Sequence, residues 1–138
     1  MKKRAVAYLS TLVVFVAIDF VWLSVMADVL YRPTLGPMLA PEFRPIPAIL
    51  FYFIYAAGLT FFAVRPGLVT AKLGTSTLYG AMLGFMAYAT YDLTNQATLV
   101  TWTTTLTVAD LIWGSLLSGV SACAGHWITE KFGGRIAR

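Results

Sequence analysis

Four apolar runs of about membrane-spanning length constrain this chain more than any other feature. They cover residues 5–27, 46–64, 77–99 and 105–128. A helix rises about 1.5 Å per residue, so about 20 residues cross a hydrocarbon core of about 30 Å. With 59% hydrophobic residues in 138, the chain is too apolar for a soluble domain of its size. We therefore predict an all-α integral membrane protein, a single transmembrane domain folded as a four-transmembrane-helix bundle.

The connections between the runs carry helix-breaking residues. Residues 28–45 contain several prolines and are predicted to form a structured loop, and Arg65-Pro66-Gly67 is predicted to end the second span. A short turn around Trp102 joins the third and fourth spans. A cleaved signal peptide is the competing interpretation of the first run, but this run is longer than the usual apolar core of such peptides. We interpret it as a span.

The positive charges predict the orientation. Four spans place both termini on one side of the membrane, and eight of the ten Lys and Arg fall on that side. These eight are Lys2, Lys3, Arg4, Arg65, Lys72, Lys131, Arg135 and Arg138, whereas only Arg32 and Arg44 lie on the other side. Cytoplasmic connections carry the excess of Lys and Arg. We expect both termini to be cytoplasmic and the chain to cross the membrane several times.

Several classes of function are disfavoured by composition. No basic patch with interleaved aromatic residues suggests a nucleic-acid partner. Cys123 is the only cysteine, which excludes an intramolecular disulfide and Cys-x-x-Cys chemistry. His126 has no second His or Cys at ligand spacing, so we predict no metal site centred on it. The sequence indicates no particular cofactor.

Three aspartates interrupt the apolar runs and carry the functional argument. Given the predicted orientation, Asp19, Asp92 and Asp110 all fall in the outer half of the bilayer. Carboxylates are costly there, tend to face a protein interior or wet cavity, and often mark function. Asp19-x-x-Trp22-x-Ser24 recurs as Asp110-x-x-Trp113-x-Ser115, which suggests pseudo-symmetry between the first and last spans.

Other polar residues are predicted to share the level of the aspartates and to line a pocket open to the outside. Tyr88 and Asn95 lie one turn from Asp92 on the same helical face. The candidate ligand-binding residues are Asp19, Trp22, Tyr52, Tyr55, Tyr88, Tyr91, Asp92, Asn95, Asp110 and Trp113. A purely structural role, in which Tyr, Asn, Thr or Trp donors satisfy the carboxylates and fix helix register, is the alternative.

The remaining features predict packing and interfaces. Small residues recur every four positions in the fourth span and in the third, which predicts close contact between these helices. They are Gly114, Ser118 and Ala122, and Gly80 and Gly84. Tyr31 and Trp102 fit an interfacial aromatic belt, and His126 with Trp127 fits an interfacial pair at the cytoplasmic end.

The combined motifs resemble one family. They are Asp19-x-x-Trp22, Phe51-Tyr52-x-x-Tyr55, Tyr88-x-x-Tyr91-Asp92-Leu93-Thr94-Asn95 and Asp110-x-x-Trp113-Gly114. Together they are similar to those of the bacterial membrane proteins catalogued as domain of unknown function 2177, over nearly the whole chain. The resemblance implies a small four-helix protein of the bacterial inner membrane and no assigned activity.

Three functions fit this sequence. The first is a module that binds or transports a proton, cation or small polar ligand, and transport through so small a bundle would require a homodimer. The second is a membrane enzyme acting on a lipid or other apolar substrate, with paired carboxylates as acid and base or three aspartates holding a divalent metal. The third is a structural or accessory subunit.

Overall fold

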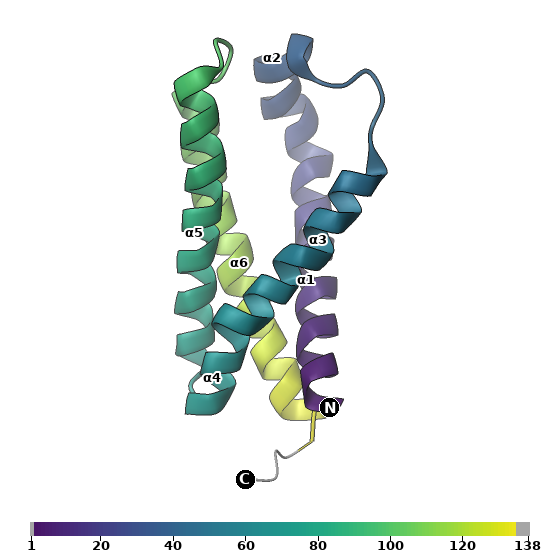
Figure 1. The fold of residues 1–138 in the computed structure, drawn as a ribbon, viewed down its shortest axis with the longest axis vertical. Coiled ribbons are helices and arrows are strands. Elements are labelled where there is room, and N and C mark those ends of the chain that lie inside the picture. Colours follow the sequence, from purple (N-terminus) through teal and green to yellow (C-terminus); the bar gives the residue numbers. More distant parts are fainter. Residues whose placement is uncertain (1, 135–138) are drawn as a thin grey trace.

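Four long helical segments form an antiparallel bundle in the computed structural model, which describes residues 2–134 (Figure 1). The segments are α1 (Lys2–Met26), the continuous run of α3 (Pro45–Leu59), η3 (Thr60–Val64) and α4 (Arg65–Thr70), then α5 (Leu73–Thr98) and α6 (Thr104–Phe132). The start of α1 and the end of α6 lie at the same end of the bundle. The described residues contain no strand, so the protein is all-α.

The stretch predicted as a loop after the first span is largely helical, which corrects the sequence interpretation. It continues α1 through η1 (Ala27–Tyr31), α2 (Arg32–Leu35) and η2 (Gly36–Met38). Pro33 and Pro37 each lie in the first turn of their helical piece, where a proline's missing N–H is not needed. Only residues 39–44 are irregular.

The second span also continues beyond its predicted end. The helix passes through Arg65-Pro66-Gly67, because Pro66 occupies the first turn of α4 and the preceding turn, η3, is a wide π-helical one. The helix instead ends at Thr70. There Ala71 adopts a left-handed conformation, with φ of 52°, that stops helical propagation.

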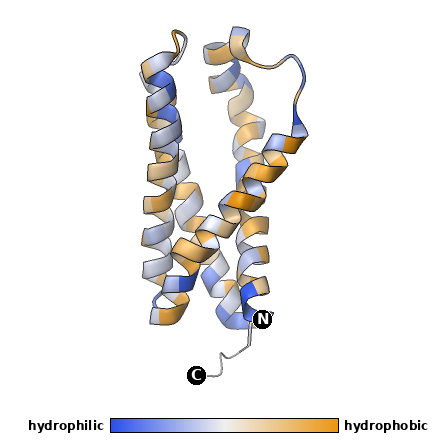
Figure 2. Cartoon of the chain, in the orientation of Figure 1, coloured by the Kyte–Doolittle hydropathy of each residue, from blue (hydrophilic) through white to orange (hydrophobic). Residues whose placement is uncertain are grey.

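Many large apolar side chains face outward and many polar ones face inward, unlike the pattern of a soluble protein. Phe20 and Ile54 are each 70% exposed, whereas Asp92, Ser118 and Thr129 are completely buried. Three helical stretches are long and apolar enough to cross a membrane: Lys2–Met38, Pro45–Thr70 and Thr104–Phe132. The helix α5 is equally long but less apolar, as its paler colouring in Figure 2 shows.

The closest helix contact is the small-residue seam between α5 and α6, as the sequence predicted. A Cβ atom at Gly80 would lie 2.6 Å from the Ser118 carbonyl oxygen and 2.7 Å from the Ala122 Cβ. At Gly84 it would collide with the Gly114 carbonyl oxygen. Only glycine permits this approach, which brings the polar faces of the two helices together.

Candidate functional site

Asp19 on α1 is the first of the three buried carboxylates and is fully supplied with donors. It is 5% exposed. The Tyr52 hydroxyl on α3 donates to its Oδ2 at 2.7 Å, and the Trp113 indole N–H on α6 donates to its Oδ1 at 3.2 Å. Asp19 therefore joins three helices through neutral donors.

Asp110 on α6 is 4% exposed and also has a donor. The Tyr31 hydroxyl donates to Asp110 Oδ1 at 2.6 Å and accepts from the Trp22 indole N–H at 3.0 Å. Tyr31 was predicted to be only an interfacial residue, and that interpretation is wrong. No Gly or Pro separates Trp22 from Tyr31, so the helix continues from α1 through η1. Tyr31, at the end of η1, is thereby placed within hydrogen-bonding distance of Trp22 and Asp110.

In the two Asp-x-x-Trp motifs, the Trp of each motif is hydrogen-bonded, directly or through Tyr31, to the Asp of the other. Trp22 and Trp113 stack with ring centroids 4.2 Å apart and planes 7° from parallel. Because α1 and α6 run antiparallel, each Trp, one turn beyond its own Asp, reaches the level of the other Asp. Trp113 donates directly to Asp19, and Trp22 reaches Asp110 through Tyr31. This exchange gives the sequence recurrence a pseudo-symmetric basis.

Asp92 on α5 has no donor. It is completely buried, and neither carboxylate oxygen has a hydrogen-bond partner among the described residues. The group within hydrogen-bonding reach is the Asp110 carboxyl, which can bond to Asp92 only when the pair holds a proton. Two ionised carboxylates in contact repel, whereas one shared proton joins them.

Two tyrosines complete the polar interior around these carboxylates. The Tyr55 hydroxyl lies 2.8 Å from Ser118 Oγ, which links α3 to α6. Tyr88 lies over Gly114, whose missing side chain makes room for the ring, and is near enough to Asp19 and Asp110 to be affected by their charge. Tyr52 contacts Asp19, whereas Tyr55 contacts Ser118 and no carboxylate.

The two remaining candidates near the end of α5, Tyr91 and Asn95, differ in exposure. Tyr91 is 57% exposed and packs edge-on against Trp102, so the structure does not bring it into the carboxylate cluster. Asn95 is half-buried. Gln96, which was not a candidate, accepts from Thr107 at 2.7 Å.

Two residues predicted for the membrane interface are buried instead. Trp102 is 8% exposed and donates to Thr107 at 3.0 Å. His126 is completely buried while its neighbour Trp127 is 52% exposed, so they do not form an interfacial pair. Adjacent residues on a helix point about 100° apart, so Trp127 faces outward while His126 faces the interior.

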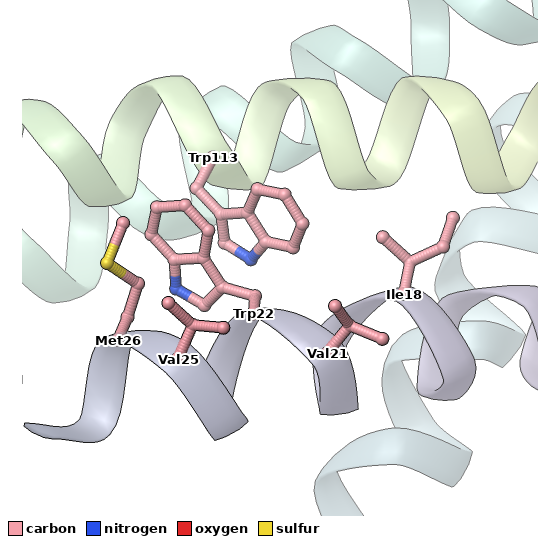
Figure 3. A pocket seen from close by; sticks show the side chains of 6 residues that line it. All are labelled: Ile18, Val21, Trp22, Val25, Met26 and Trp113. Carbon is pink, nitrogen blue, oxygen red and sulfur yellow. The ribbon is translucent and has the colours of Figure 1, made fainter.

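An apolar groove of about 410 Å³ adjoins the carboxylate cluster (Figure 3). It is lined by Ile18, Val21, Trp22, Val25, Met26 and Trp113. The candidate pocket was predicted to be polar, but only the two tryptophans of the candidate set line this groove. Their rings form part of its wall while their N–H groups bond into the carboxylate cluster. A molecule in the groove would therefore be one indole away from Asp19.

The three aspartates do not form one coordination sphere. Within residues 2–134, no three acidic, His or Cys side chains converge in a way that would hold a metal ion. Asp92 and Asp110 are direct neighbours, whereas Asp19 connects to them through the tryptophan pair and Tyr31. The arrangement can hold a proton between two carboxyls and is short of ligands for a divalent cation.

Comparison with known proteins places the chain in a family. No curated protein and no solved structure matches it. The family described as "Predicted membrane protein (DUF2177)" matches residues 4–127, which span all four long helical segments and all three buried aspartates. This chain therefore belongs to that family of membrane proteins.

Proposed function

We propose that this membrane protein binds a proton, or a small cation in its place, at the Asp92–Asp110 pair and exchanges it across the membrane. The observation that carries the proposal is the complete burial of both Asp92 oxygens without a donor. An ionised carboxylate in that position loses its hydration and gains nothing in return. A proton removes the charge and supplies the missing hydrogen bond to Asp110.

A purely structural role accounts less well for Asp92 than for the other two aspartates. Asp19 and Asp110 accept hydrogen bonds from Tyr and Trp side chains and so fix α1 with its continuation η1, α3 and α6 relative to one another. Asp92 contributes no such link. A Ser or Asn at this position would fill the same space at a smaller cost of insertion. Its acidity is the property that a proton site requires.

The proposed setting is a bacterial inner membrane with both termini in the cytoplasm. Lys and Arg are concentrated at the end of the bundle that holds the start of α1 and the end of α6, as the positive-inside rule requires. The carboxylate cluster then lies in the outer half of the bilayer. A second copy of the chain is the expected partner, because one bundle of four segments encloses little volume for a transport path.

The groove supports a second candidate function, an enzyme acting on a lipid or other apolar substrate. Its apolar lining faces the bilayer, where Val21 is 63% and Val25 is 58% exposed. A substrate in the groove would be separated from Asp19 by the Trp113 ring and from Asp110 by Trp22 and Tyr31, and these two carboxyls could act as acid and base. Mass spectrometry of lipids incubated with wild type and Asp110→Asn would reveal a consumed substrate. A lipid profile unchanged by wild type would count against this candidate.

Reconstitution into vesicles with an entrapped pH-sensitive dye tests the first function. Wild type should let an imposed proton gradient, or a gradient of a small monovalent cation, change the internal pH faster than empty vesicles. Asp92→Asn should lose this effect, whereas Asp28→Asn should retain it. Asp28 is a matched control because it is an exposed carboxylate paired with Arg32 outside the cluster. Equal activity of Asp92→Asn and wild type would contradict the proposal.

A further inference from the structure

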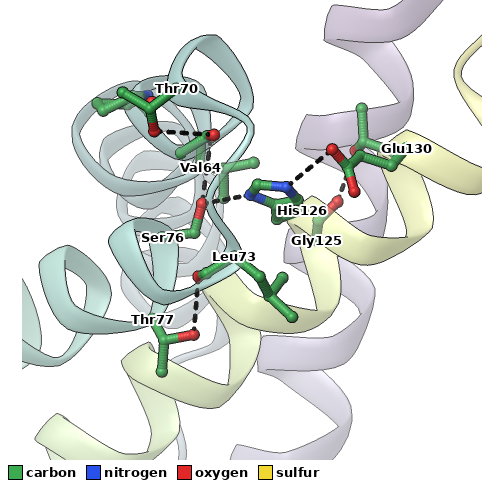
Figure 4. A network of polar contacts seen from close by, with 11 residues as sticks. Val64, Thr70, Leu73, Ser76, Thr77, Gly125, His126 and Glu130 are labelled. Carbon is green, nitrogen blue, oxygen red and sulfur yellow. Dashed lines mark hydrogen bonds and ion pairs between the residues drawn. The ribbon is translucent and has the colours of Figure 1, made fainter.

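A second buried polar cluster lies where α4, α5 and α6 meet, at the end of the bundle that holds the start of α1 (Figure 4). It is centred on His126, the only histidine of the chain, which is completely buried. Ser76 Oγ lies 2.8 Å from His126 Nδ1 and donates to the Val64 carbonyl oxygen at 3.3 Å. His126 Nε2 lies 3.3 Å from Oε1 of the half-exposed Glu130, at ion-pair distance, but makes no hydrogen bond there. Two hydrogen bonds and one ion-pair contact, three links in all, therefore join these four groups.

The number of hydrogens available decides whether all three links can exist together. The Val64 carbonyl and the Glu130 carboxylate carry no hydrogen, so Ser76 and His126 must supply them all. Ser76 supplies one, and a neutral imidazole supplies one more. Two hydrogens cannot make three links. One additional proton, held between the imidazole and Glu130, supplies the third hydrogen, so that all three links can form at once.

We infer that His126 and Glu130 form a proton-binding site distinct from the carboxylate cluster, and that the bound proton ties the α4–α5 hairpin to α6. The three links join the end of η3 at Val64, the start of α5 at Ser76 and the last turns of α6. When the proton leaves, either the Val64 carbonyl or Glu130 loses its donor. The contact between the hairpin and α6 is then weaker.

The packing around the site favours this role over catalysis. Ser76, His126 and Glu130 are connected like the members of a hydrolytic triad. Ser76, however, is completely buried, and a Cβ atom at Gly67 would lie only 2.9 Å from His126 Nδ1 and would overlap Ser76 Oγ. No substrate can reach the serine beneath α4. The links act within the fold.

The charged groups of the surrounding elements leave Glu130 as the partner of His126. Arg65 of α4 lies over the Phe61 ring and Lys131 of α6 lies over the Trp127 ring. Lys3 of α1 lies beside Gly133. Among residues 2–134, the other charges at this end are Lys2 and Arg4 of α1 and Lys72 before α5. In the described part of the chain, no second cation is within ion-pair distance of Glu130.

Two measurements test the inference on full-length protein. Selective ¹⁵N labelling reports only His126, so its spectra count the ring hydrogens directly as pH is varied. Hydrogen exchange of residues 64–76, corrected for the intrinsic effect of pH, reports how firmly the hairpin is held. In wild type, loss of the second ring hydrogen should accompany a several-fold faster exchange of this hairpin.

Glu130→Gln is the informative variant, because an amide N–H facing Nε2 supplies the third hydrogen permanently. Its hairpin exchange should stay slow and independent of pH, whereas the control Glu42→Gln, in the exposed loop, should behave as wild type. Asp92→Asn should also keep the wild-type pH response, which separates this site from the carboxylate cluster. An imidazole with a single hydrogen at every pH, or hairpin exchange that ignores its deprotonation, would overturn the inference.

Discussion

The regions around Asp19 and Asp92 hold the same side chain at similar burial but in opposite surroundings. Asp19 receives hydrogen bonds from Tyr52 and Trp113, one to each oxygen. Asp92 receives none and is within reach of a second carboxyl, that of Asp110. A carboxylate that accepts hydrogen bonds from neutral donors can link helices at fixed positions. A carboxyl group without donors makes no such link, and its distinctive property is that it can bind and release a proton. The supply of donors, rather than burial, separates the aspartate that links helices from the one that we propose binds a proton.

The largest expected effect comes from removing the acid that lacks donors. Asp92→Asn should abolish proton uptake. At a pH where wild type has lost the shared proton, it should also raise stability by about 1–2 kcal/mol, because its amide donates to Asp110 and the charge of Asp92 is gone. Asp19→Asn should lower stability by a similar amount, since the amide can accept only one of the two bonds. Thermal unfolding in detergent, followed by circular dichroism, gives the two signs. The same sign for both variants would remove the distinction.

Making Asp110 resemble Asp92 should have the next largest effect. Tyr31→Phe removes the donor to Asp110 and the acceptor for Trp22, at a cost of about 1–3 kcal/mol. Tyr91→Phe is the matched control, because that ring is largely exposed. Comparison of their unfolding temperatures tests the assignment. A Tyr31→Phe protein as stable as the control would show that Asp110 needs no donor.

The tryptophan pair should contribute less. Trp113→Phe removes one of the two donors to Asp19, and Trp22→Phe removes the donor to Tyr31, each costing about 1 kcal/mol. Because the rings stack, a double-mutant cycle should show coupling of about 0.5–1.5 kcal/mol. Strictly additive losses would mean that the two motifs act independently.

The smallest effects are expected at the serines that end the two motifs. Ser24 and Ser115 each donate to the carbonyl oxygen four residues earlier, at 2.7 and 2.8 Å, and neither contacts a carboxylate. Ser24→Ala and Ser115→Ala should each change stability by less than about 0.5 kcal/mol. Denaturation of both variants beside wild type measures this. A larger loss would extend the functional cluster to these positions.

The apolar runs and the spacing of small residues predicted the helices and the α5–α6 seam, because both depend on local periodicity. The donors to the carboxylates were predicted only in part. Tyr31 was missed because Pro33 was interpreted as belonging to a loop, although it fits the first turn of a helix. Trp102 donates to Thr107, only five residues along the chain, but the sequence does not show how the turn between α5 and α6 orients the ring. The partner of His126 is Ser76, 50 residues earlier in the chain, which no local pattern indicates.

Infrared spectroscopy of the carboxyl groups tests the central claim most directly. Wild type should show the C=O stretching band of a protonated carboxyl that shifts in heavy water. The band should disappear in Asp92→Asn and in Asp110→Asn, because either change removes the pair that shares the proton, and it should persist in Asp19→Asn. A wild type without a protonated carboxyl, or a band lost in Asp19→Asn and retained in Asp92→Asn, would contradict the account.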